Sequence, residues 1–188
     1  FRQPHMLADQ TAVDQPRPGA RALRFTGEGH QARYLRVTAT RLWNRRRQGN
    51  PQTKDWIFAI GELAVLSKGH LAKIHNVTAQ DSIEALPSWG RQNLADGIYG
   101  KFNLPDLAEV EYGITSPTNG YHSQMVPAAN TVKWVQVDLG ARYPVQRIEL
   151  VPAQPTDWKE TPGFGFPVRF RLEVDNDPKF PNPQLIFD

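Results

Sequence analysis

The stretch Trp134-Val135-Gln136-Val137-Asp138-Leu139-Gly140 alternates between apolar and polar residues from its first valine onward. A period of two is typical of a β-strand that has one buried face and one exposed face. We therefore predict that the two valines and Leu139 face a hydrophobic core. Gly140 is predicted to mark a turn, followed by a further strand at residues 145–151.

Similar strand patterns occur elsewhere in the chain. Residues 33–40 and 168–174 alternate in the same way, whereas residues 57–66 form a more apolar run that Glu62 interrupts. The helical signal is weak and lies at residues 104–111. Because these strands are separated by punctuated loops, with 16 Pro and 14 Gly in the chain, we predict an all-β fold, an antiparallel β-sandwich.

The composition excludes several classes of function. The 188 residues include 22 basic and 19 acidic side chains, so the net charge is only +3, and the dense basic cluster at residues 41–47 is interpreted as a solvated hairpin tip. We therefore expect no nucleic-acid partner. The chain has no cysteine, which excludes disulfides, thiol catalysis and thiolate metal sites. No apolar stretch is long enough for a helical membrane span, so none is expected.

Four segments carry a resemblance to a known family. The turn Asn93-Leu94-Ala95-Asp96-Gly97, followed by strands at residues 134–140 and 145–150, resembles the discoidin (coagulation-factor C-type, galactose-binding-like) family. The run Gly61-Glu62-Leu63-Ala64-Val65 resembles the strand that closes such a module. The resemblance implies a jelly-roll-like antiparallel sandwich of the galactose-binding-like type.

Two further runs, at residues 32–43 and 163–170, resemble discoidin-type modules attached to bacterial α-L-rhamnosidase-like glycoside hydrolases. The resemblance implies that the chain belongs to a larger exported bacterial protein that degrades glycans. Such a module would be secreted, periplasmic or on the cell surface. Its expected role is carbohydrate binding, or accessory support of a catalytic domain, without chemistry of its own.

The order of these parts is reversed relative to the resembled family. Residues 1–67 resemble the closing strands of a module, residues 68–70 read as a linker, and residues 71–188 resemble the opening and middle strands. The chain is therefore either cut from tandem modules or folded as one sandwich with a permuted strand order. An uncovered apolar face costs about 25 cal/mol per Å². We therefore expect the two parts to pack together, within one chain or by swapping between chains.

The resemblance also implies a structural Ca²⁺ site. In the family, the Asp of the turn, backbone carbonyls and a Glu of the closing strand hold the cation, and Ca²⁺ needs several such oxygen ligands. The matching residues are Glu62, Asn93 and Asp96. Burying a carboxylate in an apolar strand is also costly unless it has a partner. Glu62 is therefore expected to have one. The alternatives are that Glu62 pairs with an arginine or lies at an exposed edge, and that Asp96 only caps a turn.

Carbohydrate binding is predicted in the long loops. A pyranose binds through its C–H face to an aromatic ring, while a few polar groups recognise its hydroxyls. The alternative for each aromatic residue is that it packs over an end of the sandwich. The candidate residues are Trp158 with Asp157 and Lys159, Tyr121 with His122, and Trp43 with Arg45.

Catalytic motifs are not recognisable in the sequence. The five histidines lack the spacing of a metalloprotease, and no serine lies in a nucleophile-elbow pattern. We therefore predict a non-catalytic module that binds a glycan or neighbouring domains of a parent protein. The alternative is a purely structural interdomain or cell-surface scaffold module without a ligand.

Overall fold

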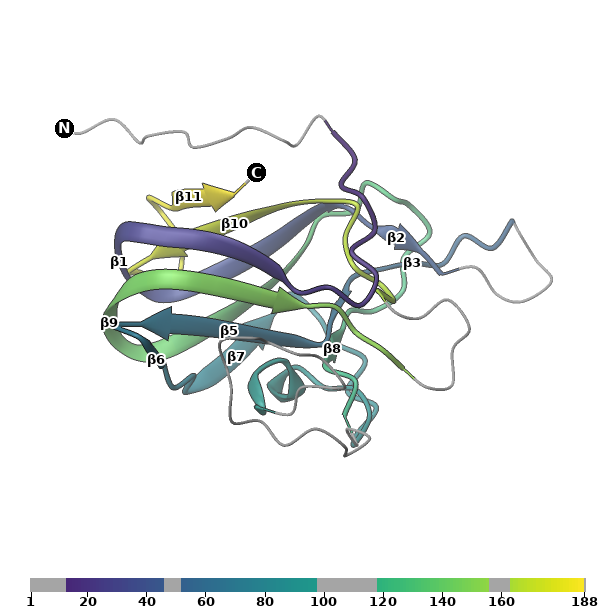
Figure 1. The fold of residues 1–188 in the computed structure, drawn as a ribbon. Coiled ribbons are helices and arrows are strands. Elements are labelled where there is room, and N and C mark those ends of the chain that lie inside the picture. Colours follow the sequence, from purple (N-terminus) through teal and green to yellow (C-terminus); the bar gives the residue numbers. More distant parts are fainter. Residues whose placement is uncertain (1–12, 46–51, 98–117, 156–162, 188) are drawn as a thin grey trace.

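A seven-stranded antiparallel sheet dominates the computed structural model, which describes residues 13–45, 52–97, 118–155 and 163–187 (Figure 1). Its strands are β1 (Leu23–Arg41), β5 (Glu62–Ser67), β6 (His70–Leu71), β7 (Asn76–Ala79), β9 (Lys133–Val151), β10 (Arg169–Asp175) and β11 (Gln184–Phe187). Their order is β11-β10-β1-β9-β5-β6, and β7 also pairs with β9. The prediction of an all-β antiparallel fold is confirmed.

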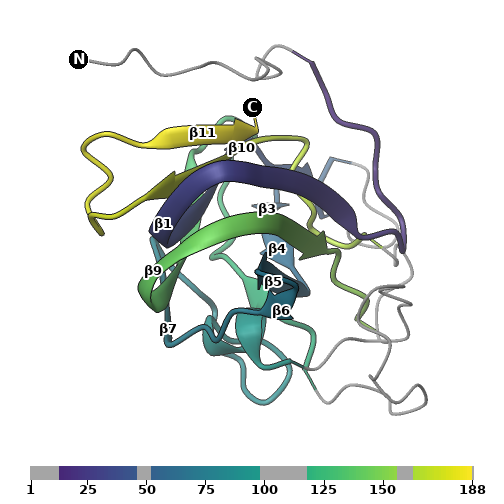
Figure 2. The same cartoon turned by 60° about the vertical axis from the view of Figure 1, so that its left-hand side comes forward.

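The two longest strands, β1 and β9, bend together and so divide the sheet into two layers. Residues 34–39 of β1 pair with residues 133–138 of β9, and β10, β11 and β7 extend this first layer. Residues 23–32 of β1 pair with residues 143–150 of β9, and β5 and β6 extend the second layer. Both strands curve round at one end of the molecule, which faces the viewer in Figure 2.

The core lies between these two layers. The predicted inward residues of β1, Leu35, Val37 and Ala39, are at most 1% exposed. They belong to one cluster with apolar residues from both ends of β9 and from β5, so a single core joins the layers. The shared members from β9 and β5 are Val135, Val137, Leu139, Val145, Ile148, Leu150, Leu63 and Val65.

Gly140 does not separate two strands, so that prediction is wrong. The residue has a positive φ of 76° inside the continuous strand β9. A Cβ at this position would lie 2.5 Å from the His75 ring, so glycine is required. The register of the β1–β9 pair shifts here, between Ala32 and Tyr34 of β1. Because the partner strand bends alongside it, β9 passes from one layer to the other without leaving the sheet.

The predicted strand at residues 57–66 is also interrupted. It divides into β3 (Trp56–Ile57), β4 (Ala59–Ile60) and β5, because its first residues leave the main sheet for two small ones. In those sheets β3 pairs with β2 (Trp43–Asn44), and β4 pairs with β8 (Tyr121–His122). A short 3₁₀ helix, η1 (Gln92–Ala95), follows in the chain. The helix expected at residues 104–111 lies outside the described residues.

Strands from both parts of the chain share the main sheet. From residues 1–67, β1 pairs with β9 and β10, and β5 pairs with β9. The expected linker at residues 68–70 is instead part of a tight hairpin in which Ser67 pairs with His70. Lys68 and Gly69 form its turn with φ values of 51° and 81°, a conformation typical of two-residue hairpins. Within this chain, the two parts therefore pack together directly.

Candidate functional site

The segment at residues 118–124, which contains β8, connects the functional features at one end of the sandwich. It runs between the loop at residues 80–97 and the small strand β4 (Figure 1). The Ile83 amide donates to the His122 carbonyl at 3.0 Å, which ties the loop to β8. Side chains of this segment therefore have little freedom to move.

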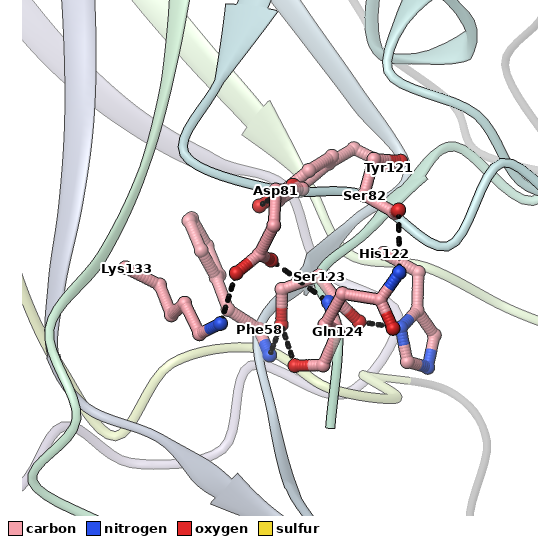
Figure 3. Close-up of polar contacts among 8 residues, drawn as sticks. All are labelled: Phe58, Asp81, Ser82, Tyr121, His122, Ser123, Gln124 and Lys133. Atoms are coloured by element: carbon pink, nitrogen blue, oxygen red, sulfur yellow. Dashed lines mark hydrogen bonds and ion pairs between the residues drawn. The ribbon is translucent and has the colours of Figure 1, made fainter. Parts of the chain in front are cut away.

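Asp81 links this segment to β9 (Figure 3). Its carboxylate forms an ion pair with Lys133, a side chain that is only 4% exposed. It also accepts a 2.8 Å hydrogen bond from the backbone amide of Gln124. The Tyr121 hydroxyl donates to the Asp81 carbonyl at 3.1 Å. A buried lysine is stable when a carboxylate compensates its charge, so this cluster is structural.

Ser123 is similarly occupied by structural contacts (Figure 3). Its hydroxyl accepts from the Phe58 amide at 3.0 Å and donates to the Gln124 carbonyl at 3.0 Å. The Gln124 side chain in turn donates to the Ser82 carbonyl at 2.9 Å. Because Ser123 is 0% exposed and its proton is used internally, its hydroxyl is not available as a nucleophile.

Tyr121 and His122, predicted to contact a sugar from a long loop, are buried in the structure. Their exposed fractions are 0% and 3%, because β8 packs against the core and the 80–97 loop. The His122 Nδ1–H donates to the Ser123 carbonyl at 2.6 Å, and its ring meets Trp89 edge to face at 5.0 Å. Burial lowers the pKa of His122 to about 4, so the ring is neutral at neutral pH.

Glu62, the first residue of β5, and Asp96, which directly follows η1, are neighbours. Glu62 is 3% exposed, and its Oε1 accepts a 3.3 Å hydrogen bond from the Gly97 amide. Its Oε2 is buried and has no hydrogen-bond partner among the described residues. Burial raises the pKa of Glu62 well above its usual value, and the nearby Asp96 carboxylate raises it further. Two carboxylates in this position need a shared proton or a cation between them.

The surroundings of this carboxylate pair fit a calcium ion in part. Asp96 is exposed, so solvent reaches the pair, and its Oδ2 accepts a 2.8 Å hydrogen bond from Thr118. Asn93 uses its amide nitrogen to bond the Pro87 carbonyl at 2.8 Å, so its amide orients the loop. The described residues contain no group of three or more acidic or histidine side chains around a point. A Ca²⁺ ion held here would therefore need backbone carbonyls and water as further ligands.

An aromatic cluster covers the same end of the sandwich. The rings of Trp43 and Trp89 lie 5.3 Å and 5.6 Å from the ring of buried Phe164. Arg17 lies over the Trp43 ring at 5.4 Å. Both tryptophans remain partly exposed. The cluster therefore offers apolar ring surface beside a guanidinium group, a combination that suits a sugar ring with polar substituents.

The other predicted sugar contacts have different surroundings. Arg45 lies near the cluster, with its Nη1 3.4 Å from the Met125 sulfur. Trp43 is the predicted contact that the structure places in the aromatic cluster. The remaining candidates, Asp157, Trp158 and Lys159, lie outside the described residues.

Two features of this end were missed from the sequence. Neither Trp89, which packs against the small core cluster that contains Phe164, nor Phe164 itself was among the site residues predicted from the sequence. Gly120 pairs with Trp89 through a single β-bridge and has φ at 100°. An added Cβ at Gly120 would lie 2.2 Å from the Ile60 carbonyl oxygen. The Trp89–Gly120 bridge places the 80–97 loop over this close approach. The available sequence signal for this close approach was the run Gly120-Tyr121-His122 between long loops.

Comparison of the chain with protein-family models, curated proteins and solved structures gave no match. The discoidin resemblance therefore stays a prediction that depends on the motifs themselves. Within the part of the chain that the structure describes, no helix has the length and apolar character of a membrane span.

Proposed function

We propose that the chain is a non-catalytic accessory module of a larger exported glycan-degrading protein of bacteria, and that it binds carbohydrate. The observation that carries this proposal is the partly exposed pair Trp43 and Trp89, both supported by Phe164. Aromatic rings that are held rigidly from below bind a pyranose with little loss of side-chain entropy.

The carboxylate pair supports the same end of the molecule. The loop that carries Trp89 also carries Asp96, and Thr118 bonds Asp96 from the segment that leads into β8. A Ca²⁺ ion between Glu62 and Asp96 would join β5 to this loop. The proposed role of the ion is therefore to fix the loop on which the aromatic surface depends, and not to act on a substrate.

A glycan array followed by titration calorimetry tests carbohydrate binding. We expect saturable binding of at least one oligosaccharide, and a loss of about tenfold or more in affinity for Trp43→Ala, since truncating a stacked ring costs roughly 1.5 kcal/mol or more. Trp134→Ala is the matched control, because Trp134 lies on the outer face of the first layer and packs against Arg36. Equal losses in both variants, or an array without any binding, would contradict the proposal.

A scaffold module without a ligand is the second candidate. It is favoured by the burial of Tyr121 and His122, which shows that aromatic residues of this end also serve packing. Trp158→Ala distinguishes the candidates further. Binding that survives both this substitution and Trp43→Ala would place the ligand elsewhere, whereas a complete absence of binding would favour the scaffold.

A further inference from the structure

A hollow of about 370 Å³ is lined by residues at the bend of β1 and β9. In Figure 1 this bend lies opposite the end that carries β2, β3 and β8. The hollow opens between the bend and the β5–β6 turn. Its volume falls at the lower end of the range of small-molecule sites. The lining residues used below are His30, Gln31, Lys68, Pro144, Val145 and Gln146.

The hollow arises from an irregular register. Thr26 of β1 pairs with Arg147 of β9, but the next pair is His30 with Val145, so three residues of β1 oppose one of β9. Such a bulge bends the strand and leaves backbone outside the ladder. Gly29 in the bulge has φ at 88°, and an added Cβ would meet no atom within 4 Å. The space beside the bulge is therefore open.

Side-chain contacts hold the walls of the hollow in place. The Gln146 Oε1 accepts a 2.9 Å hydrogen bond from the Gly69 amide, which fixes the β5–β6 turn against the bulge. The His30 Nδ1 lies 3.0 Å from the Gln184 Oε1 of β11, which fixes the ring on the other side. The site is consequently formed before any ligand arrives, and binding would require little ordering.

The lining has a consistent chemical character. Pro144 provides apolar surface, and Gln31 provides an exposed amide that both donates and accepts hydrogen bonds. Lys68 adds an exposed ammonium group, and no carboxylate is found among the lining residues whose side chains the structure describes. A small ligand with hydroxyl groups, one apolar face and one negative charge matches these groups.

We propose that this hollow binds a carboxylate-bearing monosaccharide unit, such as a hexuronate. Lys68 pairs with the carboxylate, Gln31 and His30 hydrogen-bond the hydroxyls, and Pro144 contacts the C–H face. The site is separate from the aromatic cluster, so this proposal and the proposed function are tested independently.

Titration of the ¹⁵N-labelled chain by NMR with glucuronate and galacturonate, and with glucose and galactose as neutral controls, tests the proposal. We expect shifts of the amides at residues 29–31, 68–69 and 145–146 with a uronate. Lys68→Asn tolerates the positive φ of the turn and should weaken uronate binding roughly two- to fivefold, as expected for a partly exposed charge pair. Lys73→Asn, which changes an exposed lysine that does not line the hollow, should leave it unchanged.

Gln31→Trp supplies a second variant that fills the hollow and leaves Lys68 in place. It should abolish the shifts. Uronate binding that is unaffected by both Gln31→Trp and Lys68→Asn would overturn the proposal. So would equal binding of neutral sugars and uronates, or no shift of these amides at 20-fold excess over a Kd of about 1 mM, an affinity typical of weak single-sugar sites.

Discussion

Two buried carboxylates on the same face of the β5–β9 pair have opposite surroundings. Glu149 is 0% exposed and lies 2.9 Å from the Arg147 Nε and 3.3 Å from the Arg24 Nε. Glu62 is 3% exposed and has another carboxylate, Asp96, as its neighbour. Both point away from the core, since the alternate residues of β5 and β9 fill it.

This difference separates a structural ion pair from a candidate cation site. The positive charges that compensate Glu149 belong to the protein itself, although neither of its carboxylate oxygens has a hydrogen-bond partner among the described residues. The charge beside Glu62, on Asp96, has the same sign as its own. A buried carboxylate in that state is unfavourable unless a proton or a cation joins it. The same strand pair thus contains one carboxylate that stabilises the fold, Glu149, and one that requires a proton or a cation, Glu62.

The largest effect is expected at Glu149. Glu149→Gln removes the carboxylate charge that Arg24 and Arg147 share, and because both arginines are partly exposed, the loss should be about 3 kcal/mol rather than the upper value for fully buried pairs. Urea denaturation at pH 7 measures it. A change below about 0.5 kcal/mol, the usual range of a surface substitution, would remove the contrast with Glu62.

A buried histidine, His122, provides the next test. Its pKa is lowered to about 4 by burial, so the unfolded chain takes up a proton at a higher pH than the folded chain does. The contribution of His122 to stability is therefore complete above pH 6.5 and falls as the pH drops, by about 2 kcal/mol between pH 6.5 and 5.

The control is His122→Asn, which retains a donor near the Nδ1 position. The difference in unfolding free energy between wild type and variant should change with this slope. A difference independent of pH would mean that His122 has the same pKa in the folded state as in the unfolded state, as an exposed imidazole does.

Glu62→Gln is expected to act in the opposite direction to Glu149→Gln. In the presence of chelator at pH 7, the substitution removes the repulsion with Asp96 and should raise stability by about 1 kcal/mol. The sign follows from the raised pKa, which makes the carboxylate form of Glu62 less favourable in the folded state than in the unfolded state. Destabilisation under chelator would show that Glu62, like Glu149, is already compensated.

The smallest effect is expected at Thr118, which donates to the exposed carboxylate Asp96. Thr118→Val keeps the shape of the side chain and should cost about 0.5–1 kcal/mol, the typical net value of one hydrogen bond. Thermal unfolding of this variant and of Thr78→Val, a control on the exposed side of β7, provides the comparison. Equal effects would show that the Thr118 contact does not orient Asp96.

The sequence predicted those parts of the fold that depend on local alternation. The inward faces of β1 and β9 follow directly from residues such as Leu35 and Val137, whose burial a period of two specifies. The bend at Gly140 was missed because it depends on β1 curving alongside β9, which no local pattern records. The burial of Tyr121 and His122 was missed because the loop at residues 80–97 covers β8.

The candidate sites divide in the same manner. The neighbourhood of Glu62 and Asp96 was expected from the resemblance alone, since residues far apart in the chain give no local sign of contact. The hollow at the bend was not expected, because it results from a shifted register between Thr26 and His30 of β1. Register shifts depend on both strands, and the sequence shows each strand separately.

A calcium titration followed by thermal unfolding tests the cation site most directly, with wild type and Glu62→Gln measured side by side after removal of divalent ions. The account predicts that Ca²⁺ raises the Tm of the wild type in a saturable manner, binds at one ion per chain, and leaves the Tm of Glu62→Gln unchanged. A wild-type Tm that does not respond to millimolar Ca²⁺, or an equal response in both proteins, would contradict it.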